Sequence, residues 1–372
     1  MNILFWADGF WPRIGGTETQ GWQFVQEMQK RGHSCIVLCQ KDGPTIADQE
    51  VHEGVMIWRF DFDAIIKRRE LKVVGPLRKA LEKIKNEFRP SVIYLNTLHN
   101  GSAFAFLLFR RLFSAQTVLT VHAPYFGNTI PKFLLKICLK VDHICLASDW
   151  GYKEMIRVFP SFHEKMQVIY CGISPPKIEP TKLPFNPATI LLLGRLSFEK
   201  GFEIGIEAFA LLRKKRDDIR LLIAGEGDER PFLESLTLQF GIEDCVEFTG
   251  GFARDSEAVF SLINRSTFVV IPSHFETFGL VALETMRMGR AVIASDVGGL
   301  PEIVSNGKTG LLVPPANVKA FCSAIQTLLE NQEMTCQMGQ QARKWAMHRY
   351  LLKENVDQYE KLFSSFHSYG RL

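Results

Sequence analysis

The fold of this chain is decided by one stretch, IPSHFETFGLVALE, at residues 271–284. An apolar run ends at Ile271, and a short polar loop that begins with Pro272 then leads into apolar residues at helical spacing. This order predicts a strand, a loop and the start of a helix. Glu276 would then lie in the loop, and Glu284 about two turns into the helix.

Three residues between these glutamates mark the predicted helix start. Phe278, Gly279 and Leu280 supply backbone N–H groups there, and a helix N-terminus is a ready site for anions. The glycine lets a ligand approach the backbone closely. Two carboxylates beside such a site indicate a ligand that carries both phosphates and hydroxyl groups.

A longer run of residues around this stretch carries a resemblance. It comprises Pro272, Ser273, Glu276, Phe278–Leu280, Leu283, Glu284, Gly289, GGLPEIV at 298–304 and an NG–G-LLV pattern at 306–313. Together these motifs resemble the retaining nucleotide-sugar glycosyltransferases of glycosyltransferase family 4, also called glycosyl transferases group 1. The pair of glutamates alone would be weak evidence for this family, because two glutamates at that spacing arise often by chance. Ala291 departs from the proline that is usual in the family, and we interpret this difference as structural.

The resemblance implies the GT-B fold, which is an α/β architecture of two doubly wound Rossmann-like domains with a cleft between them. An N-terminal, acceptor-side domain is expected over residues 1–174, and a last helix at 352–367 is expected to pack back onto it. A proline-rich linker follows at 175–187. The domain that binds the nucleotide sugar is expected over residues 188–350.

The residue pattern itself favours two mainly parallel sheets, because strand-like and helical segments alternate in both halves. The first half predicts strands at 2–7, 33–39, 55–60, 91–95, 116–121, 143–147 and 166–170, and helices at 17–31, 75–88, 101–113, 131–140 and 149–158. The second half predicts strands at 189–193, 219–224, 245–248, 267–271, 291–294 and 310–313, and helices at 201–215, 229–240, 254–264, 279–288 and 317–330, with two more near 334–348 and 352–367.

Composition and charge limit the classes of protein. A chain of 372 residues with 46% hydrophobic residues is long enough to fill two cores. Residues 1–175 carry 22 Lys and Arg against 16 Asp and Glu, within a net charge of +4 for the whole chain. This surplus is too weak for a nucleic-acid binder, but it fits an anionic partner surface.

Cysteine spacing and the N-terminus indicate a cytoplasmic setting. The eight cysteines form no Cys-x-x-Cys pair and no paired zinc spacing, so we expect buried thiols in a reducing compartment. The first residues lack the basic start and the cleavage site of a secretory leader. The most apolar stretches, 103–113 and 133–147, are interrupted by charges and fall short of the ~20 residues that span a bilayer. The expected protein is therefore cytoplasmic, with peripheral attachment to the cytoplasmic membrane face left open.

In open α/β sheets, ligands bind beyond the carboxyl ends of the strands, so the loops there are examined first. After the first strand, residues 8–18 read DGFWPRIGGTE, and Gly15 and Gly16 could present N–H groups to a diphosphate. By resemblance this is the family's glycine loop, with Gly16 closest to the phosphates or the sugar. The alternative is an ordinary turn that Thr17 caps.

A second loop, GRLSFEKG at 194–201, follows the strand at 189–193. Arg195 and Lys200 flank the start of the next helix, where a guanidinium, an ammonium and a helix N-terminus suit a departing diphosphate. The loop matches the family's Gly-Arg-Leu-x-x-x-Lys-Gly without a departure. The alternative is two solvated basic residues.

Two further strand ends contribute candidates. His122 matches the family's Thr-Val-His and is expected to hydrogen-bond the transferred sugar, although Ala123 is a departure and a lone histidine is usually structural. Gly225 and Glu226 belong to a GEGD loop that lacks the third glycine of a dinucleotide fingerprint. We expect this loop to line the base pocket through its backbone.

Two other motifs carry less weight. The DFD triplet at 61–63 looks like the metal-binding Asp-x-Asp of a different glycosyltransferase fold. It lies beside the basic run at 67–69, far in sequence from the phosphate-binding residues, so no metal is expected. Cys171 and Ser174 depart from the Asn-Gly-Ile-Asp hinge of the family.

Taken together, the resemblance implies a retaining, metal-independent glycosyltransferase of the hexosyltransferase type that uses no cofactor. Its donor is a nucleoside diphosphate sugar, and its acceptor is a glycan or lipid-linked hydroxyl in glycolipid, lipopolysaccharide, exopolysaccharide or other glycan synthesis. Arg195 and Lys200 would stabilise the leaving diphosphate, Glu276 would hold sugar hydroxyls, and Glu284 would hold the ribose. The alternatives are a sugar phosphorylase on the same fold and a catalytically silent nucleotide-sugar-binding module.

Segments of the first half also combine cationic with apolar residues. They are residues 104–113, 132–140 and 67–72. Interfacial helices combine such residues to bind anionic membrane surfaces. The alternative is that the apolar residues pack on the sheet and the charges are solvated.

Overall fold

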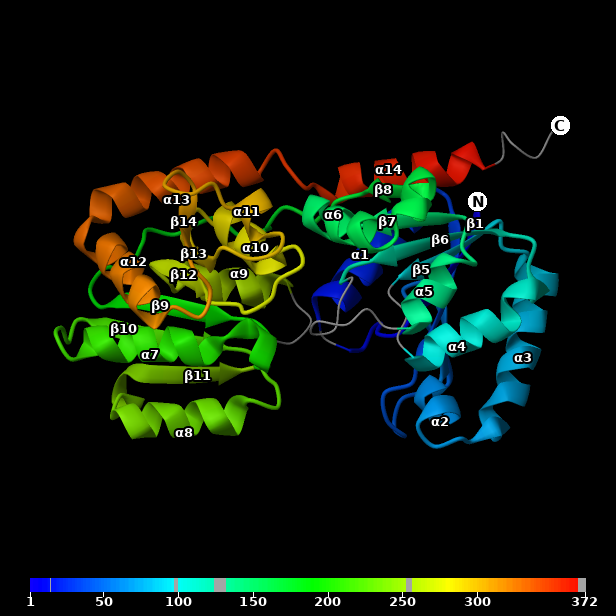
Figure 1. The fold of residues 1–372 in the computed structure, drawn as a ribbon, viewed down its shortest axis with the longest axis horizontal. Helices are drawn as coiled ribbons and strands as arrows, with labels where there is room; N and C mark the ends of the chain where they lie inside the picture. Colours follow the sequence, from blue (N-terminus) through cyan, green and yellow to red (C-terminus); the bar gives the residue numbers. More distant parts are fainter. Residues whose placement is uncertain (14, 97–99, 124–131, 252–255, 367–372) are drawn as a thin grey trace. The chain divides into compact units, whose positions relative to one another are not determined.

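The computed structural model describes residues 1–13, 15–96, 100–123, 132–251 and 256–366, and the statements below refer to these residues. They form two compact units. Unit 1 comprises Met1–Gly172 with Leu352–Leu372, and unit 2 comprises Ile173–Leu351. Their helices and strands are labelled in Figure 1. The parts of the sequence-based assignments that fall on residues 14, 131, 254–255 and 367 lie outside the described residues.

Unit 1 is built on an eight-stranded sheet with the order β3-β4-β2-β1-β5-β6-β7-β8. All neighbours are parallel except β3 and β4. The strands are β1 (Asn2–Ala7), β2 (Ser34–Gln40), β3 (Gln49–His52), β4 (Val55–Phe60), β5 (Val92–Asn96), β6 (Gln116–Val121), β7 (His143–Leu146) and β8 (Met166–Val168). The α-helices are α1 (Gly16–Lys30), α2 (Phe62–Ile66), α3 (Val74–Lys83), α4 (Asn100–Phe109), α5 (Lys132–Cys138), α6 (Asp149–Val158) and α14 (Leu352–Ser365).

Both faces of this sheet are covered, which explains why its central strands read as continuous apolar runs. Side chains alternate between the two faces of a strand. On β1, Leu4 and Trp6 therefore pack in the core with α3 and α4, whereas Ile3 and Phe5 pack with α1 and α14.

The last helix, α14, belongs to unit 1 and packs along α1. Arg31 donates to Asp357 at 2.6 Å and to Glu360 at 2.8 Å. Beneath the helix, the hydroxyl of Tyr359 lies 2.6 Å from Thr120 Oγ1 of β6. The apolar stripe that marks this helix in the sequence is thus buried on the first sheet.

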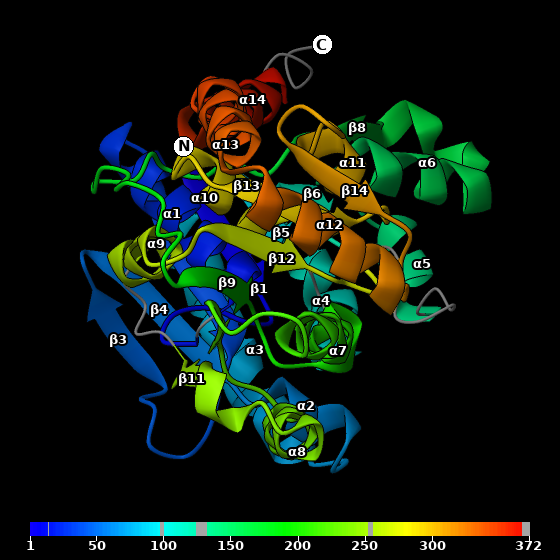
Figure 2. The same ribbon diagram turned by 90° about the vertical axis from the view of Figure 1, so that its left-hand side faces the viewer.

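Unit 2 is built on a six-stranded parallel sheet with the order β11-β10-β9-β12-β13-β14. The strands are β9 (Ala188–Leu193), β10 (Ile219–Ala224), β11 (Val246–Gly250), β12 (Phe268–Ile271), β13 (Ala291–Ser295) and β14 (Gly310–Val313). The α-helices are α7 (Phe202–Arg213), α8 (Arg230–Phe240), α9 (Ser256–Asn264), α10 (Leu280–Arg287), α11 (Leu300–Ile303), α12 (Val318–Glu330) and α13 (Gln332–Ala346). Helices α7 and α12 lie side by side and share one core with the sheet (Figure 2).

Two buried arginines fasten the proline-rich segment to unit 2. Arg287 donates to the carbonyl oxygens of Ile173 and Ser174, at 2.7 and 2.8 Å. Arg290 donates to the carbonyl oxygen and the hydroxyl of Thr181, both at 3.0 Å. Each guanidinium uses several donors on backbone carbonyls, and burial lowers both pKa values to about 10. The segment without regular structure is therefore anchored to the second sheet.

The structure corrects the bounds of several helices and strands that the sequence predicts. The strand expected at 166–170 ends at Val168, and the helix expected at 75–88 changes to a π-turn at Ile84–Phe88. The edge strand β3 and the short helix α2 were missed. Each has only four or five residues, so neither gives the repeated apolar pattern on which the prediction depends. All eight cysteines are free. The sequence predicts buried thiols, but Cys245, Cys322 and Cys336 are only half-buried.

Candidate functional site

The stretch at 271–284 forms the predicted strand, loop and helix start. Gly279 caps α10 with a φ of 104°, a left-handed conformation that favours glycine. No side chain caps this helix start. Its first N–H groups are therefore available to a ligand.

Glu276 is held in the loop that leads to α10. Its carbonyl oxygen accepts from the amide of Gly299 at 3.1 Å, and its Oε1 accepts from the amide of Thr277 at 3.2 Å. Gly298 has a φ of 57°, and a Cβ at that position would overlap the Glu276 carbonyl. The glycine pair at 298–299 thus fixes the backbone that aims the Glu276 carboxylate.

Lys200 joins the second loop to Glu276. Its Nζ lies 2.7 Å from Glu276 Oε2, and both side chains are mostly buried. The amides of His274 and Phe275 donate to the carbonyl of Glu199, at 3.0 and 3.2 Å. Gly201 allows this contact, because a Cβ there would overlap the Pro272 carbonyl. The two loops are therefore locked together by backbone contacts.

Arg195 projects from the same loop and is exposed. Within the described part of the chain, its side chain makes no hydrogen bond or ion pair. A free guanidinium near the start of α7 can bind a phosphate with two donors. Lys200 is thus paired with a carboxylate, whereas Arg195 has no partner among the described residues.

Glu284 lies on α10 and is partly buried. Desolvation raises the pKa of its carboxyl to about 7, and the charge of Arg287 opposes this rise. In the described residues its carboxylate has no hydrogen-bond donor. A carboxylate without a donor, about one turn beyond the helix start, can accept bonds from vicinal hydroxyls of a ligand.

Gly225 and Glu226 fix the loop after β10. A Cβ at Gly225 would overlap the Gly194 carbonyl, and the carbonyl of Glu226 accepts from Leu196 at 3.0 Å. The Glu226 carboxylate is engaged by Arg230 and by the amide of Gly251. These contacts hold the loop against the one that carries Arg195. The role at a nucleotide base stays a prediction.

Gly15, Gly16 and His122 belong to unit 1. Gly15 is extended and precedes α1, and among the described residues no side chain caps this helix start. Glu18 is buried beneath the loop, with its carboxylate 2.8 Å from Thr17 Oγ1 and 3.3 Å from Arg13 Nε. Ile14 of the glycine loop lies outside the described residues.

His122 is held by Asn96, which the sequence analysis did not single out, and by Cys171, which it noted only as a departure from the family's hinge. Its Nε2 lies 2.7 Å from Asn96 Oδ1, and its Nδ1 lies 3.7 Å from the Cys171 sulfur. Burial lowers the pKa of the imidazole to about 4, although the charge of Glu18 opposes this. The ring is therefore neutral near pH 7. Asn96 could have been found from its place at the carboxyl end of β5.

Asp61 and Asp63 are each paired with a cation of unit 1. Asp61 caps α2 through the Ala64 amide and is paired with Arg68, and Asp63 is paired with Lys67 at 2.8 Å. In the described ranges, no three His, Cys, Asp or Glu side chains gather closely enough to hold a metal ion.

Two buried hydroxyls at strand ends were not assigned a role from the sequence. Ser273, which the sequence analysis noted only as part of the family resemblance, follows β12, and Ser295, which it did not name, ends β13. Each Oγ is buried without a partner in the described structure. They lie at the carboxyl ends of adjacent strands, where ligands bind in such sheets.

Comparison with known proteins identifies the family. The family model "Glycosyl transferases group 1" matches residues 174–345, and "Glycosyltransferase Family 4" matches residues 14–176. A glycogen synthase of Mycobacterium tuberculosis is 34% identical over 89% of this chain and 86% of its own length. An alpha-D-kanosaminyltransferase of Streptomyces kanamyceticus is 37% identical, and the match covers 45% of this chain and 43% of that protein. An uncharacterized glycosyltransferase of Methanocaldococcus jannaschii is 32% identical, and the match covers 56% of this chain and 57% of that protein. The chain spans about half the length of these last two relatives.

Solved structures share the fold. A sucrose-phosphate synthase from Thermosynechococcus elongatus superposes with a TM-score of 0.85 at 22% identity over 100% of both chains. The HepE protein of Anabaena, in complex with UDP and glucose, gives a TM-score of 0.77 at 20% identity over 98% of this chain and 100% of that chain. With its two α/β units and parallel sheets, the chain therefore belongs to glycosyltransferase family 4 and has the GT-B fold.

Proposed function

We propose that this protein is a retaining glycosyltransferase that moves a sugar from a nucleoside diphosphate sugar to a hydroxyl acceptor. The observation that carries the proposal is the contact between Lys200 and Glu276. It brings a cation for phosphate and a carboxylate for sugar hydroxyls together, and Arg195, which has no partner among the described residues, belongs to the same loop as Lys200. The family membership supports the same reaction class.

In the proposed reaction, the bond between the anomeric carbon and the leaving phosphate oxygen breaks. Negative charge develops on the diphosphate, where Arg195, Lys200 and the open amides of α10 would stabilise it. Fixed donors of this kind lower the barrier because they act most strongly on the transition state. Glu284 would hold the ribose hydroxyls.

Retention follows, in this proposal, from attack on the same face that the leaving group departs from. The acceptor oxygen bonds to the anomeric carbon, and its proton passes to the leaving phosphate oxygen. The products are the new glycoside and the nucleoside diphosphate. The proposal assigns no carboxylate as a nucleophile for a double displacement, since Glu276 is proposed to hold sugar hydroxyls and is paired with Lys200.

The donor class is tested by the release of nucleoside diphosphate from a panel of nucleotide sugars. Solved complexes of HepE contain UDP or UDP-glucose, so UDP-sugars are the first probes. Release that depends on an added acceptor supports the transferase. Consumption of the product glycoside with inorganic phosphate would instead indicate the phosphorylase, and tight binding without release would indicate a silent module.

For the acceptor we propose a glycan or lipid-linked hydroxyl at an anionic membrane surface of the cytoplasmic side. The described part of the chain contains no helix long and apolar enough to cross a membrane. Helices α4 and α5 contact each other in unit 1. Leu108, Leu135 and Leu139 on these segments are 49%, 36% and 58% exposed. Exposed lysines lie beside the last two leucines, which supports an interfacial role.

A further inference from the structure

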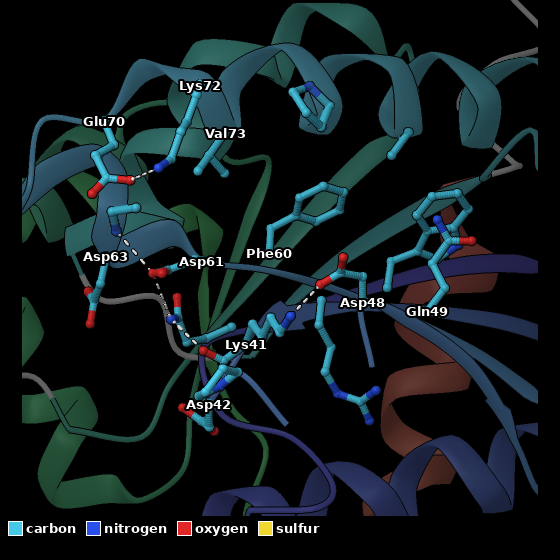
Figure 3. A pocket seen from close by; sticks show the side chains of 18 of the residues that line it. Lys41, Asp42, Asp48, Gln49, Phe60, Asp61, Asp63, Glu70, Lys72 and Val73 are labelled. Atoms are coloured by element: carbon cyan, nitrogen blue, oxygen red, sulfur yellow. Dashed lines mark hydrogen bonds and ion pairs between the residues drawn. The ribbon is translucent and has the colours of Figure 1, made fainter. Parts of the chain in front are cut away.

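Unit 1 contains a cavity of about 1070 Å³ that the proposed donor chemistry does not use (Figure 3). It is lined by the segments that follow β2 and β4, by β4 itself and by α3. Binding sites for small molecules usually measure about 300–1,000 Å³. The space is therefore large enough for a ligand of more than one ring.

The apolar part of the cavity comes from β4 and α3. Trp58 and Phe60 are two residues apart on β4, so their side chains extend from the same face of the strand. Val73, Pro76 and Ala80 add aliphatic surface to the lining. Phe60 lies in the middle of the lining in Figure 3. Aromatic and aliphatic surfaces of this kind suit a ligand with an apolar face.

The rim of the cavity is charged, but its charges largely compensate each other. Lining cations are Lys41, Arg59, Arg68, Lys72, Lys79 and Lys83, and lining carboxylates are Asp42, Asp48, Asp61, Asp63 and Glu70. Lys41 lies 2.7 Å from Asp48, and Lys72 lies 2.9 Å from Glu70 (Figure 3). Five of the six lining cations are engaged by carboxylates, and only Lys79 has no partner among the described residues. The rim therefore offers one unpaired positive charge, whereas a polyanion requires several.

Neutral hydroxyl groups fit this rim better than anions do. A hydroxyl donates to a carboxylate and accepts from an ammonium, so it can bridge a pair such as Lys41 and Asp48 without breaking the charge balance. Hydrogen bonds to charged groups are also the stronger ones. A sugar ring combines such hydroxyls with an apolar C–H face.

We propose that this cavity is a carbohydrate subsite that holds a neutral glycan segment of the acceptor, with one sugar ring on Phe60. The identification of this glycan as the acceptor rests on the proposed function. The binding of a neutral glycan to unit 1 stands independently of it. Lys79 serves as the hydroxyl-binding cation, because its side chain has no partner among the described residues.

The test uses the full chain and measures glycan binding by saturation-transfer NMR and calorimetry. Probes are maltotriose, cellotriose and chitotriose, with a glucuronate trisaccharide as the anionic comparison. At least one neutral trisaccharide should bind more tightly than the anionic one. Lys79→Ala should weaken its binding about tenfold, the loss expected for one hydrogen bond to a charged group.

Arg78→Ala is the matched control, because Arg78 is the exposed neighbour on α3 that does not line the cavity. Phe60→Ala tests the apolar floor, and Phe60→Leu keeps apolar volume if the alanine variant fails to fold. Preferred binding of the anionic probe, or equal binding by Lys79→Ala and the wild type, would overturn the proposal. Failure of all donors to release nucleotide would refute the proposed function but leave glycan binding as a separate result.

Discussion

Lys200 Nζ lies 2.7 Å from Glu276 Oε2. A diphosphate that binds Lys200 must therefore compete with, or share, a carboxylate that the proposal assigns to the sugar. The ion pair fixes the position of the Lys200 ammonium group. Removal of either side chain would also leave the other without its ion-pair partner.

The first prediction concerns the leaving group. Lys200→Ala or Arg195→Ala should lower nucleotide release about a hundredfold, because each removes one donor that acts on the transition state. Steady-state kinetics measure this loss. Lys214→Ala, an exposed lysine after α7, is the matched control and should leave the rate unchanged. Wild-type turnover in both site variants would refute the assignment.

The second prediction concerns Glu284. Burial raises the pKa of this carboxyl from 4.5 to about 7, and its ionised form is the better acceptor for ribose hydroxyls. Nucleotide affinity should therefore rise with pH through 7, and Glu284→Ala should weaken it about tenfold. Glu276→Ala should instead lower turnover. Calorimetry that gives equal affinity for wild type and Glu284→Ala at pH 8 would contradict this.

The third prediction concerns the stability contribution of His122. Burial lowers its pKa from 6.5 to about 4, so the unfolded state binds more protons between these values. The free energy of unfolding should fall as pH drops from 6.5 toward 4, by up to about 3 kcal/mol from this group. His122→Asn should remove part of that slope in chemical denaturation. An unchanged slope would show that the imidazole is not buried.

The fourth prediction concerns metals. Cationic side chains are proposed to neutralise the diphosphate, so turnover should persist after treatment with chelator and should not rise when magnesium or manganese is added. Asp61→Asn and Asp63→Asn should leave this metal independence unchanged, because arginine and lysine already engage these carboxylates. Activity abolished by chelator and restored by either metal would reverse this view.

The fifth prediction concerns membrane attachment. The wild type should co-sediment with anionic vesicles at low salt and less at high salt, because salt screens the attraction of lysines to headgroups. Leu135→Ser with Leu139→Ser should reduce the bound fraction severalfold by removing exposed apolar area. Lys214→Glu with Lys215→Glu, in unit 2, is the control. Equally strong binding to neutral vesicles would show that attraction to anionic headgroups does not drive the attachment.

The sequence determined much of the fold, for identifiable reasons. Strands such as β1 and β9 are buried on both faces, so they appear as continuous apolar runs in the sequence. The stretch at 271–284 combines such a run with a proline, a glycine and a helical pattern. These are local signals, and they located the strand, loop and helix start to within one residue.

The tertiary structure decided what local signals cannot encode. The ion pair of Lys200 and Glu276 joins residues 76 positions apart, and the bond from Asn96 to His122 crosses between two strands. The raised pKa of Glu284 arises from burial, which depends on everything packed around α10. The cavity beside Phe60 likewise exists only because α3 and the loop after β2 stand apart from β4. Contact, burial and empty space depend on which distant segments meet, and that is fixed only when the sheets assemble.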